Sequence, residues 1–148
     1  MSDWLIVIDV HVLLVRDGEV LLSKRRGAFG DGMWHLPAGK LEAGESVLEA
    51  VAREADEEVG VRIDVDDLRL VHTAHVQGDG VASRMGLFFE ARAWSGEPVN
   101  REPEKCYEIG WFRWEALPES MIPYPLAGIH GYLAGVPFGV LGWNGVVS

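Results

Sequence analysis

Apolar residues occur along the chain in runs of the length and composition of β-strands. Residues 5–15 are almost all apolar, and a second run of this kind covers residues 20–25. An Asp17-Gly18 pair lies between the two runs, and this pair favours a tight hairpin turn. The other extended segments are expected at residues 61–76, with a break near its middle, at 85–94 and at 109–114.

Glycine and proline separate these runs and predict where the chain is irregular. The expected irregular segments are a flexible loop at 27–33, a connection at 34–45, a turn at 78–80 and a loop at 95–104. A weaker helix is expected at 125–134, where two glycines lower the helix propensity. Strands and helices mix without regular alternation, which favours an α/β sandwich around a mixed sheet.

The clearest helix is expected at residues 46–59. Ser46 followed by Glu49 forms a capping box at its start. Gly60 stands where a residue in the left-handed conformation commonly ends a helix. Both ends of this helix are therefore marked in the sequence.

Three glutamates share one face of this helix when successive residues are placed about 100° apart. They are Glu54, Glu57 and Glu58, and the small Ala50 shares their face and would leave space in front of them. Arg53 lies beside Glu57 and can hold it in place. The neighbouring arc is the predicted core face, formed by Leu48, Val51, Ala52, Ala55 and Val59. Glu49 and Asp56 are expected to face solvent.

Like charges three and four residues apart repel and destabilise an isolated helix. A divalent cation would remove this repulsion, and Mg²⁺ prefers carboxylate oxygens, water and substrate phosphates as ligands. An acidic helix face can equally be a solvated surface. Helix geometry alone leaves both interpretations open.

Composition narrows the class of protein. The chain has 148 residues with 23 acidic and 13 basic side chains, so its net charge is −10 with histidines neutral. This length suits a single domain over residues 1–148, and this charge argues against binding a nucleic-acid polymer. The single cysteine, Cys106, excludes an internal disulfide. The N-terminal apolar run has neither a signal-peptide pattern nor the length of a membrane span, so we expect a cytoplasmic protein without a membrane partner.

The acidic helix belongs to a longer pattern. Its fixed residues are Gly39, Glu45, Arg53, Glu54, Glu57, Glu58 and Gly60, and aliphatic positions hold Ala55 and Val61. This spacing resembles the Nudix box, the signature of the Nudix hydrolase family. The segment Trp34-His35-Leu36-Pro37-Ala38 before it also resembles the family, with Ala38 where glycine is commoner. The resemblance changes the balance in favour of a metal site.

The resemblance implies the Nudix-type α/β/α sandwich and a Mg²⁺-dependent pyrophosphohydrolase, with Mn²⁺ a possible substitute. Such an enzyme cleaves a phosphoanhydride bond in a nucleoside diphosphate linked to another group. Nucleoside triphosphates, nucleotide sugars and ADP-ribose-like molecules are of this type. A Nudix-fold sensor that binds such a nucleotide ligand without cleaving it is the alternative. Sensors tend to carry damaged boxes or an added domain, whereas this box is intact.

The resemblance also implies roles for residues of the box. Glu54, Glu57 and Glu58 would bind the metal together with a backbone carbonyl near Gly39. Glu54, Glu57 and Arg53 are the catalytic candidates, with Arg53 as an orienter of glutamates. Glu45 would support them by a salt bridge or through water to a metal. The general base is either Glu54 or an acid of a later loop, Glu102 or Glu104.

Residues outside the box are weaker candidates for contact with substrate. They are Arg25 and Arg26 for phosphates, Phe29 and Trp34 for stacking, and Glu102 and Glu104 in the loop. An ordinary surface role is an open alternative for the arginines and the loop acids. The sequence does not identify the substrate.

The C-terminal segment, residues 135–148, contains no charged residue and includes several large apolar side chains. Apolar surface of this kind is usually covered, either by the rest of the domain or by a second subunit. A homodimer is therefore one hypothesis, and a monomeric mass in light scattering would exclude it.

Overall fold

The computed structural model describes residues 5–78, 82–143 and 146–147. The strands are β1 (Val7–Arg16), β2 (Glu19–Arg25), β3 (Trp34–His35), β4 (Ala38–Lys40), β5 (Leu68–Val76), β6 (Arg84–Ala91), β7 (Cys106–Arg113), β8 (Phe138–Trp143) and β9 (Val146–Val147). The helices are α1 (Val47–Val59) and α2 (Pro123–Leu133), with short 3-10 helices at Val65–Asp67 and Trp114–Ala116. No helix in these ranges is long and apolar enough to cross a membrane.

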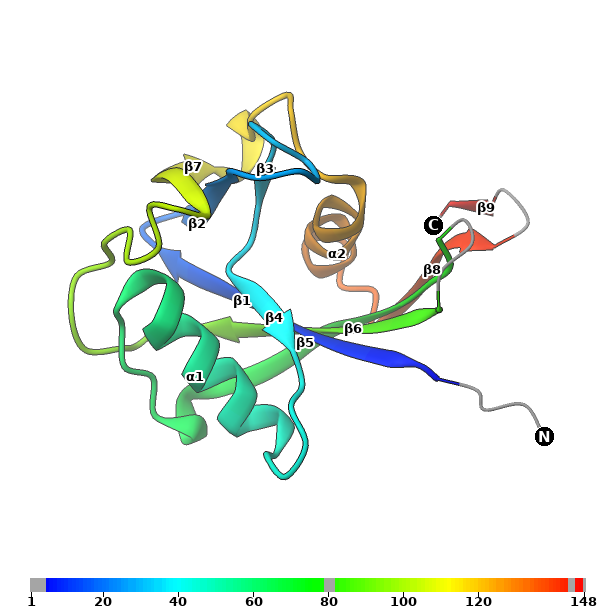
Figure 1. Ribbon diagram of the computed structural model, residues 1–148, viewed down its shortest axis with the longest axis horizontal. Coiled ribbons are helices and arrows are strands. Elements are labelled where there is room, and N and C mark those ends of the chain that lie inside the picture. The colour runs from blue at the N-terminus through cyan, green and yellow to red at the C-terminus, as the bar shows by residue number, and fades with distance from the viewer. Residues whose placement is uncertain (1–4, 79–81, 144–145, 148) are drawn as a thin grey trace.

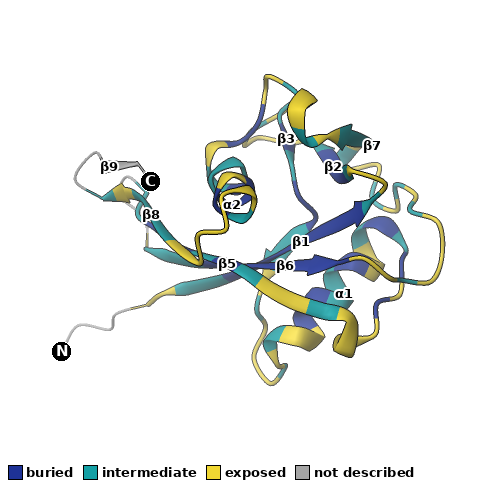
Figure 2. Cartoon of the chain, turned by 180° about the vertical axis from the view of Figure 1, so that it is seen from behind, coloured by how far each residue is buried: buried dark blue, intermediate teal, exposed yellow. Residues whose placement is uncertain are grey.

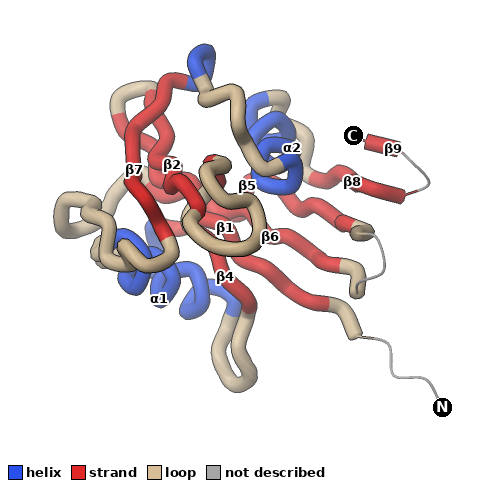
Figure 3. The backbone as a smooth tube through the Cα atoms, turned by 45° about the horizontal axis from the view of Figure 1, so that its top comes forward, coloured by secondary structure: helices blue, strands red, loops and turns tan. Residues whose placement is uncertain are grey.

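The strands form a mixed sheet with the order β3-β2-β1-β6-β5-β8-β9, and β4 pairs with β1 while β7 pairs with β2. β1 is parallel to β6 and β5 is parallel to β8, whereas β5 and β6 are antiparallel. Figure 3 shows β1, β6, β5 and β8 running side by side. α1 covers one face of the sheet and α2 the other (Figure 1). The predicted sandwich of helices around a mixed sheet is confirmed.

The apolar character of β1 follows from its position at the centre of the molecule. Val10 and Val12 belong to the core under α1, together with Val51 of that helix. Leu13 points to the opposite core, where it packs with Ile129 of α2. A strand with two buried faces lacks polar alternation, which explains the long apolar run. Figure 2 shows this burial in the middle of the sheet.

The turn and the helix ends have the geometry that their residues favour. Asp17 and Gly18 have φ angles of 53° and 77°, and two positive values are typical of a type I′ hairpin turn. The side chain of Ser46 accepts from the Glu49 amide, and the Glu49 carboxylate accepts from the Ser46 amide. Gly60 ends α1 with φ 72°. These local predictions are confirmed.

The connection predicted at residues 34–45 is not wholly irregular, because it contains β3 and β4. β4 pairs with β1, placing Gly39 opposite Val10. Both strands are too short to show a periodicity of their own, and pairing with a longer neighbour defines them. β4 also packs on α1.

The predicted core face of α1 needs one correction. Ala50, expected to leave space on the acidic face, is completely buried, and Leu48, expected in the core, is 37% exposed. The helix packs both on the sheet and on β4, so its buried arc is turned toward Ala50. The small size of Ala50 permits this close approach.

The C-terminal segment packs on its own domain through β8, which extends the sheet beside β5. The indole N–H of Trp143 donates to the carbonyl of His75 (3.0 Å). Phe138 nevertheless stays 52% exposed, and the homodimer stays a prediction. The turn predicted at residues 78–80 extends outside the described ranges.

Candidate active site

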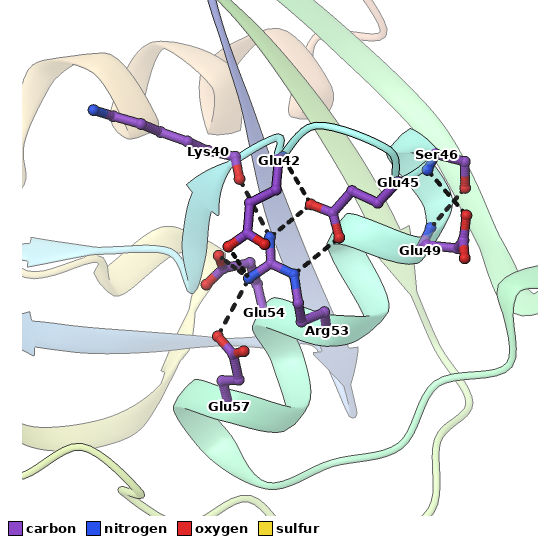
Figure 4. A network of polar contacts seen from close by, with 8 residues as sticks. All are labelled: Lys40, Glu42, Glu45, Ser46, Glu49, Arg53, Glu54 and Glu57. Atoms are coloured by element: carbon purple, nitrogen blue, oxygen red, sulfur yellow. Dashed lines mark hydrogen bonds and ion pairs between the residues drawn. The ribbon is translucent and has the colours of Figure 1, made fainter.

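Arg53 donates hydrogen bonds to three carboxylates of the acidic region (Figure 4). Its Nε and one terminal nitrogen donate to the two oxygens of Glu45, at 2.9 and 2.7 Å. The other terminal nitrogen donates to Glu54 Oε1 at 2.8 Å and to Glu57 Oε2 at 3.3 Å. The hydrogen bonds to Glu45 raise the pKa of the guanidinium, and Arg53 in turn lowers the pKa of Glu45. This paired geometry fixes the orientation of the guanidinium relative to the box glutamates.

Glu58 points away from this network, toward β4. Its Oε2 accepts from the backbone N–H of Ala38 at 2.8 Å. Burial and, secondly, the charge of Glu54 raise the pKa of Glu58 well above its usual range. Burial also raises the pKa of Glu54, against the opposing effect of Arg53. These two neighbouring carboxylates thus share a partly desolvated site, where burial and their mutual repulsion both disfavour the charged forms.

Gly39 lets the backbone of β4 approach these carboxylates. A Cβ atom on Gly39 would lie 1.9 Å from Glu54 Oε1, a separation that no side chain can adopt. Any other residue would push Glu54 away from the strand. The missing side chain therefore brings backbone and carboxylate oxygens together at one place.

The oxygen atoms of these residues are suitable ligands for a divalent cation, but the three glutamate side chains point in different directions. Within the described ranges no three His, Cys, Asp or Glu side chains are arranged as a ready metal site. Glu54 and Glu57 are turned toward Arg53, and Glu58 is turned toward Ala38. The donors are nevertheless the hard oxygens that Mg²⁺ prefers, and the space at Gly39 admits Glu54 to the backbone.

A cavity of about 130 Å³ opens beside Glu58, between α1, β2 and the chain segment around residues 102–106. Its charged or ionisable lining residues are Arg25, Arg26, His35, Glu58, Glu102, Lys105 and Cys106. Basic and acidic groups from segments far apart in sequence thus meet at one opening. Such a lining suits an anionic ligand that carries its own cation.

The structure separates the loop and stacking candidates. Arg25, Arg26 and Glu102 line the cavity, whereas Glu104 is exposed and lies outside its lining. Phe29 is 70% exposed. Trp34 corrects an expectation: it is buried in the core, edge-on to Phe112, and presents no free ring face for stacking. Burial follows from the pairing of β3 with β2, which turns the indole into the core under α2.

Sequence reasoning missed His35, Lys105 and Tyr107. His35 lines the cavity, and burial lowers its pKa to about 3, so the imidazole is neutral near pH 7. Its position next to the box was visible, but nothing in the sequence indicated which way the ring points. Lys105 and Tyr107 follow Glu102 on a loop and strand whose placement depends on pairing between β7 and β2.

Comparison with known proteins defines the class. A NUDIX domain model matches residues 6–129, and the chain belongs to this family. It is a Nudix-type hydrolase, as the box predicted. Membership implies a nucleotide-type small-molecule substrate, and members typically use a divalent metal.

Individual relatives differ in what they act on. The MutT NUDIX hydrolase of Burkholderia pseudomallei superposes with a TM-score of 0.79 at 30% identity, covering 85% of this chain and 97% of that one. The oxidized purine nucleoside triphosphate hydrolase of Danio rerio is 31% identical over 112 residues, 75% of this chain and 69% of that protein. The NAD-capped RNA hydrolase NudC of Stutzerimonas stutzeri is 36% identical over 107 residues, 72% of this chain. The chain spans only 37% of that NudC.

Proposed function

We propose that this protein is a Mg²⁺-dependent pyrophosphohydrolase that cleaves a phosphoanhydride bond in a nucleoside diphosphate linked to another group. Nucleoside triphosphates, nucleotide sugars and ADP-ribose-like molecules are the candidate substrates. The observation that carries the proposal is that Glu58 and Glu102 line the same cavity as Arg25, Arg26 and Lys105. In this proposal carboxylates bind the cation there, and basic side chains bind the phosphates.

Glu54, Glu57, Glu58 and the backbone carbonyl at Gly39 would hold the divalent ion, with Mn²⁺ a possible substitute for Mg²⁺. The ion, when bound, neutralises phosphate charge and lowers the pKa of a coordinated water. Arg53 is the positioning residue of this set, because it contacts Glu54 and Glu57 directly. Glu45 does not bind the ion in this proposal but fixes the orientation of the Arg53 guanidinium through two hydrogen bonds.

The arginines and the lysine bind the phosphates in this proposal. Arg25 is the last residue of β2, and Arg26 follows it. The backbone amide of Arg26 donates to the carbonyl of Lys105 (2.9 Å). That bond holds β2 next to the loop that carries Lys105. Phosphoanhydride cleavage depends mainly on positioning and charge stabilisation, which such a cluster supplies.

Glu102 is the general base in this proposal, in preference to Glu54. It lines the cavity beside Glu58, and its amide donates to the side chain of Asn100 (3.0 Å), which orders the loop. Glu54 has one oxygen bonded to Arg53 and serves better as a metal ligand. A carboxylate at the cavity wall can accept a proton from a water inside it.

The test is a screen of a nucleotide library with Mg²⁺ or Mn²⁺, in which products are identified and released phosphate or pyrophosphate is measured. We expect turnover of at least one nucleotide, loss of turnover with EDTA and recovery with excess Mg²⁺. Glu58→Gln should lower kcat by about 100-fold or more while the circular dichroism spectrum stays unchanged.

Hydrolysis that survives chelation would contradict the metal assignment, as would near-normal activity of both Glu57→Gln and Glu58→Gln. Tight binding of a nucleotide without any product would instead identify a sensor.

A further inference from the structure

Two exposed aromatic rings, Phe29 and Tyr107, each contact an arginine of the cavity wall, and we call them the aromatic rim. Phe29 is 70% exposed and Tyr107 is 48% exposed. The guanidinium carbon of Arg25 lies 5.6 Å from the ring centroid of Phe29, and that of Arg26 lies 5.4 Å from the centroid of Tyr107. Both arginines also line the cavity. Each ring is therefore linked to the cavity through one cationic side chain.

Hydrogen bonds hold the aromatic rim in place. The hydroxyl of Tyr107 donates to Asp31 Oδ1 at 2.9 Å, and the Gly27 amide donates to the same oxygen at 3.1 Å. Arg25 Nε donates to the carbonyl of Phe29 at 3.0 Å. Asp31 thus ties the loop at residues 27–33 to β7. A surface ordered before binding loses little conformational entropy when a ligand arrives.

The surroundings of the rim contrast with those of another exposed phenylalanine. Phe138, on the far strand β8, is 52% exposed. Within the described residues no arginine or lysine stacks on its ring. Single exposed apolar residues are common and need no function. Phe29 and Tyr107 differ because both contact cations of the cavity wall, in a chain whose net charge is −10.

The geometry points to a two-part ligand, and we propose that the aromatic rim stacks the base of the substrate while its phosphates enter the cavity. Aromatic side chains stack with every nucleobase, since each base has a π face. The inference rests on the proposed function and assigns recognition of the substrate's base to Phe29 and Tyr107. Non-aromatic diphosphates bind only through the cavity.

Calorimetric titration tests this proposal on the full chain, with Ca²⁺ in place of Mg²⁺ to limit turnover. The ligands are ADP, GDP, CDP and UDP, with inorganic pyrophosphate as the probe that lacks a base. The wild-type protein should bind at least one nucleoside diphosphate about tenfold more tightly than pyrophosphate. Phe29→Ala should remove most of that difference and leave pyrophosphate binding unchanged.

Three further variants give the matched comparison. Phe29→Trp should retain tight nucleotide binding, because it keeps an aromatic face. Tyr107→Ala should weaken nucleotides selectively, in the same sense as Phe29→Ala. Phe138→Ala removes another exposed ring, on β8 and outside the cavity lining, and should bind all ligands as the wild type does.

Equal affinity of the wild type for pyrophosphate and all four nucleotides would overturn the proposal. The proposal would also be overturned if Phe29→Ala weakened the binding of pyrophosphate and of nucleotides equally. It would likewise be overturned if none of these ligands bound to the wild-type protein. Failure of the proposed hydrolysis looks different: nucleotides would still bind in a Phe29-dependent manner, but the library screen would show no Mg²⁺-dependent product.

Discussion

Arg53 offsets part of the repulsion among the three neighbouring glutamates of α1, because it contacts two of them. Carboxylates three and four residues apart repel, yet here a guanidinium contacts Glu54 and Glu57 and is itself paired with Glu45 through two hydrogen bonds. The planar fork of arginine suits this two-sided contact, whereas the single ammonium of lysine cannot reproduce it. The residue types in the box therefore follow from the geometry that they must hold.

Glu102 and Glu104 form a matched pair for testing the general base. Both lie on one loop, but Glu102 lines the cavity and Glu104 is exposed outside it. We expect Glu102→Gln to lower kcat by about 100-fold, because general-base catalysis contributes at least that much, and Glu104→Gln to stay near the wild type. Steady-state kinetics on a substrate from the screen measures both. Equal effects of the two changes would exclude Glu102 as the specific base.

The first turn of α1 determines where the box residues of this helix lie. Its capping box fixes the first turn, and the following turns carry Arg53, Glu54 and the remaining box glutamates. The segment before it carries Glu45, whose side chain accepts from the Glu42 amide (2.9 Å) while it holds Arg53. A turn, a helix cap and a helix thus follow one another in the chain, and together they place Glu45 next to the guanidinium of Arg53.

Removing the cap by Ser46→Ala should destabilise the protein by about 1 kcal/mol, because one helix amide loses its acceptor. The melting temperature should fall by about 2–4 °C, measured by circular dichroism or calorimetry. Ser120→Ala is the control, since Ser120 is exposed and lies outside the helices and strands. An equal fall in both variants would show that the cap contributes nothing specific.

Across the whole molecule, burial of ionisable side chains makes stability depend on pH. His11 on β1 is buried between Phe88 and Tyr124, with its ring stacked 4.2 Å from that of Phe88. Neither of its ring nitrogens has a hydrogen-bond partner within the described residues. Burial lowers the pKa of His11 from 6.5 to about 4, with a smaller opposing effect from Asp9. The folded state therefore binds a proton less readily than the unfolded state.

Between pH 6.5 and about 4 the unfolded chain gains a proton at His11 that the folded chain does not, so the stabilisation present above pH 6.5 is lost as the pH falls. His11→Phe should remove this loss. Relative to the wild type, the variant should gain roughly 2 kcal/mol on going from pH 7.5 to pH 5. Urea unfolding at both pH values measures the gain, and identical pH dependence of the two proteins would contradict the prediction.

Local signals in the sequence predicted much of this protein correctly. The Asp17-Gly18 turn, the ends of α1 and the Nudix box are each defined by residues close together in the chain, so short-range sterics and hydrogen bonding determine them. The apolar run of β1 likewise indicated a buried strand. Family and fold class followed from these features.

Only the tertiary structure decided which side chains meet. Pairing of β3 and β7 with β2 buried Trp34 and placed the loop before β7 so that Glu102, but not Glu104, lines the cavity. These contacts join residues far apart in the chain, and no local propensity encodes them. The acidic helix itself could be predicted from its sequence, whereas the cavity beside it exists only because the sheet brings the second half of the chain back to Glu58.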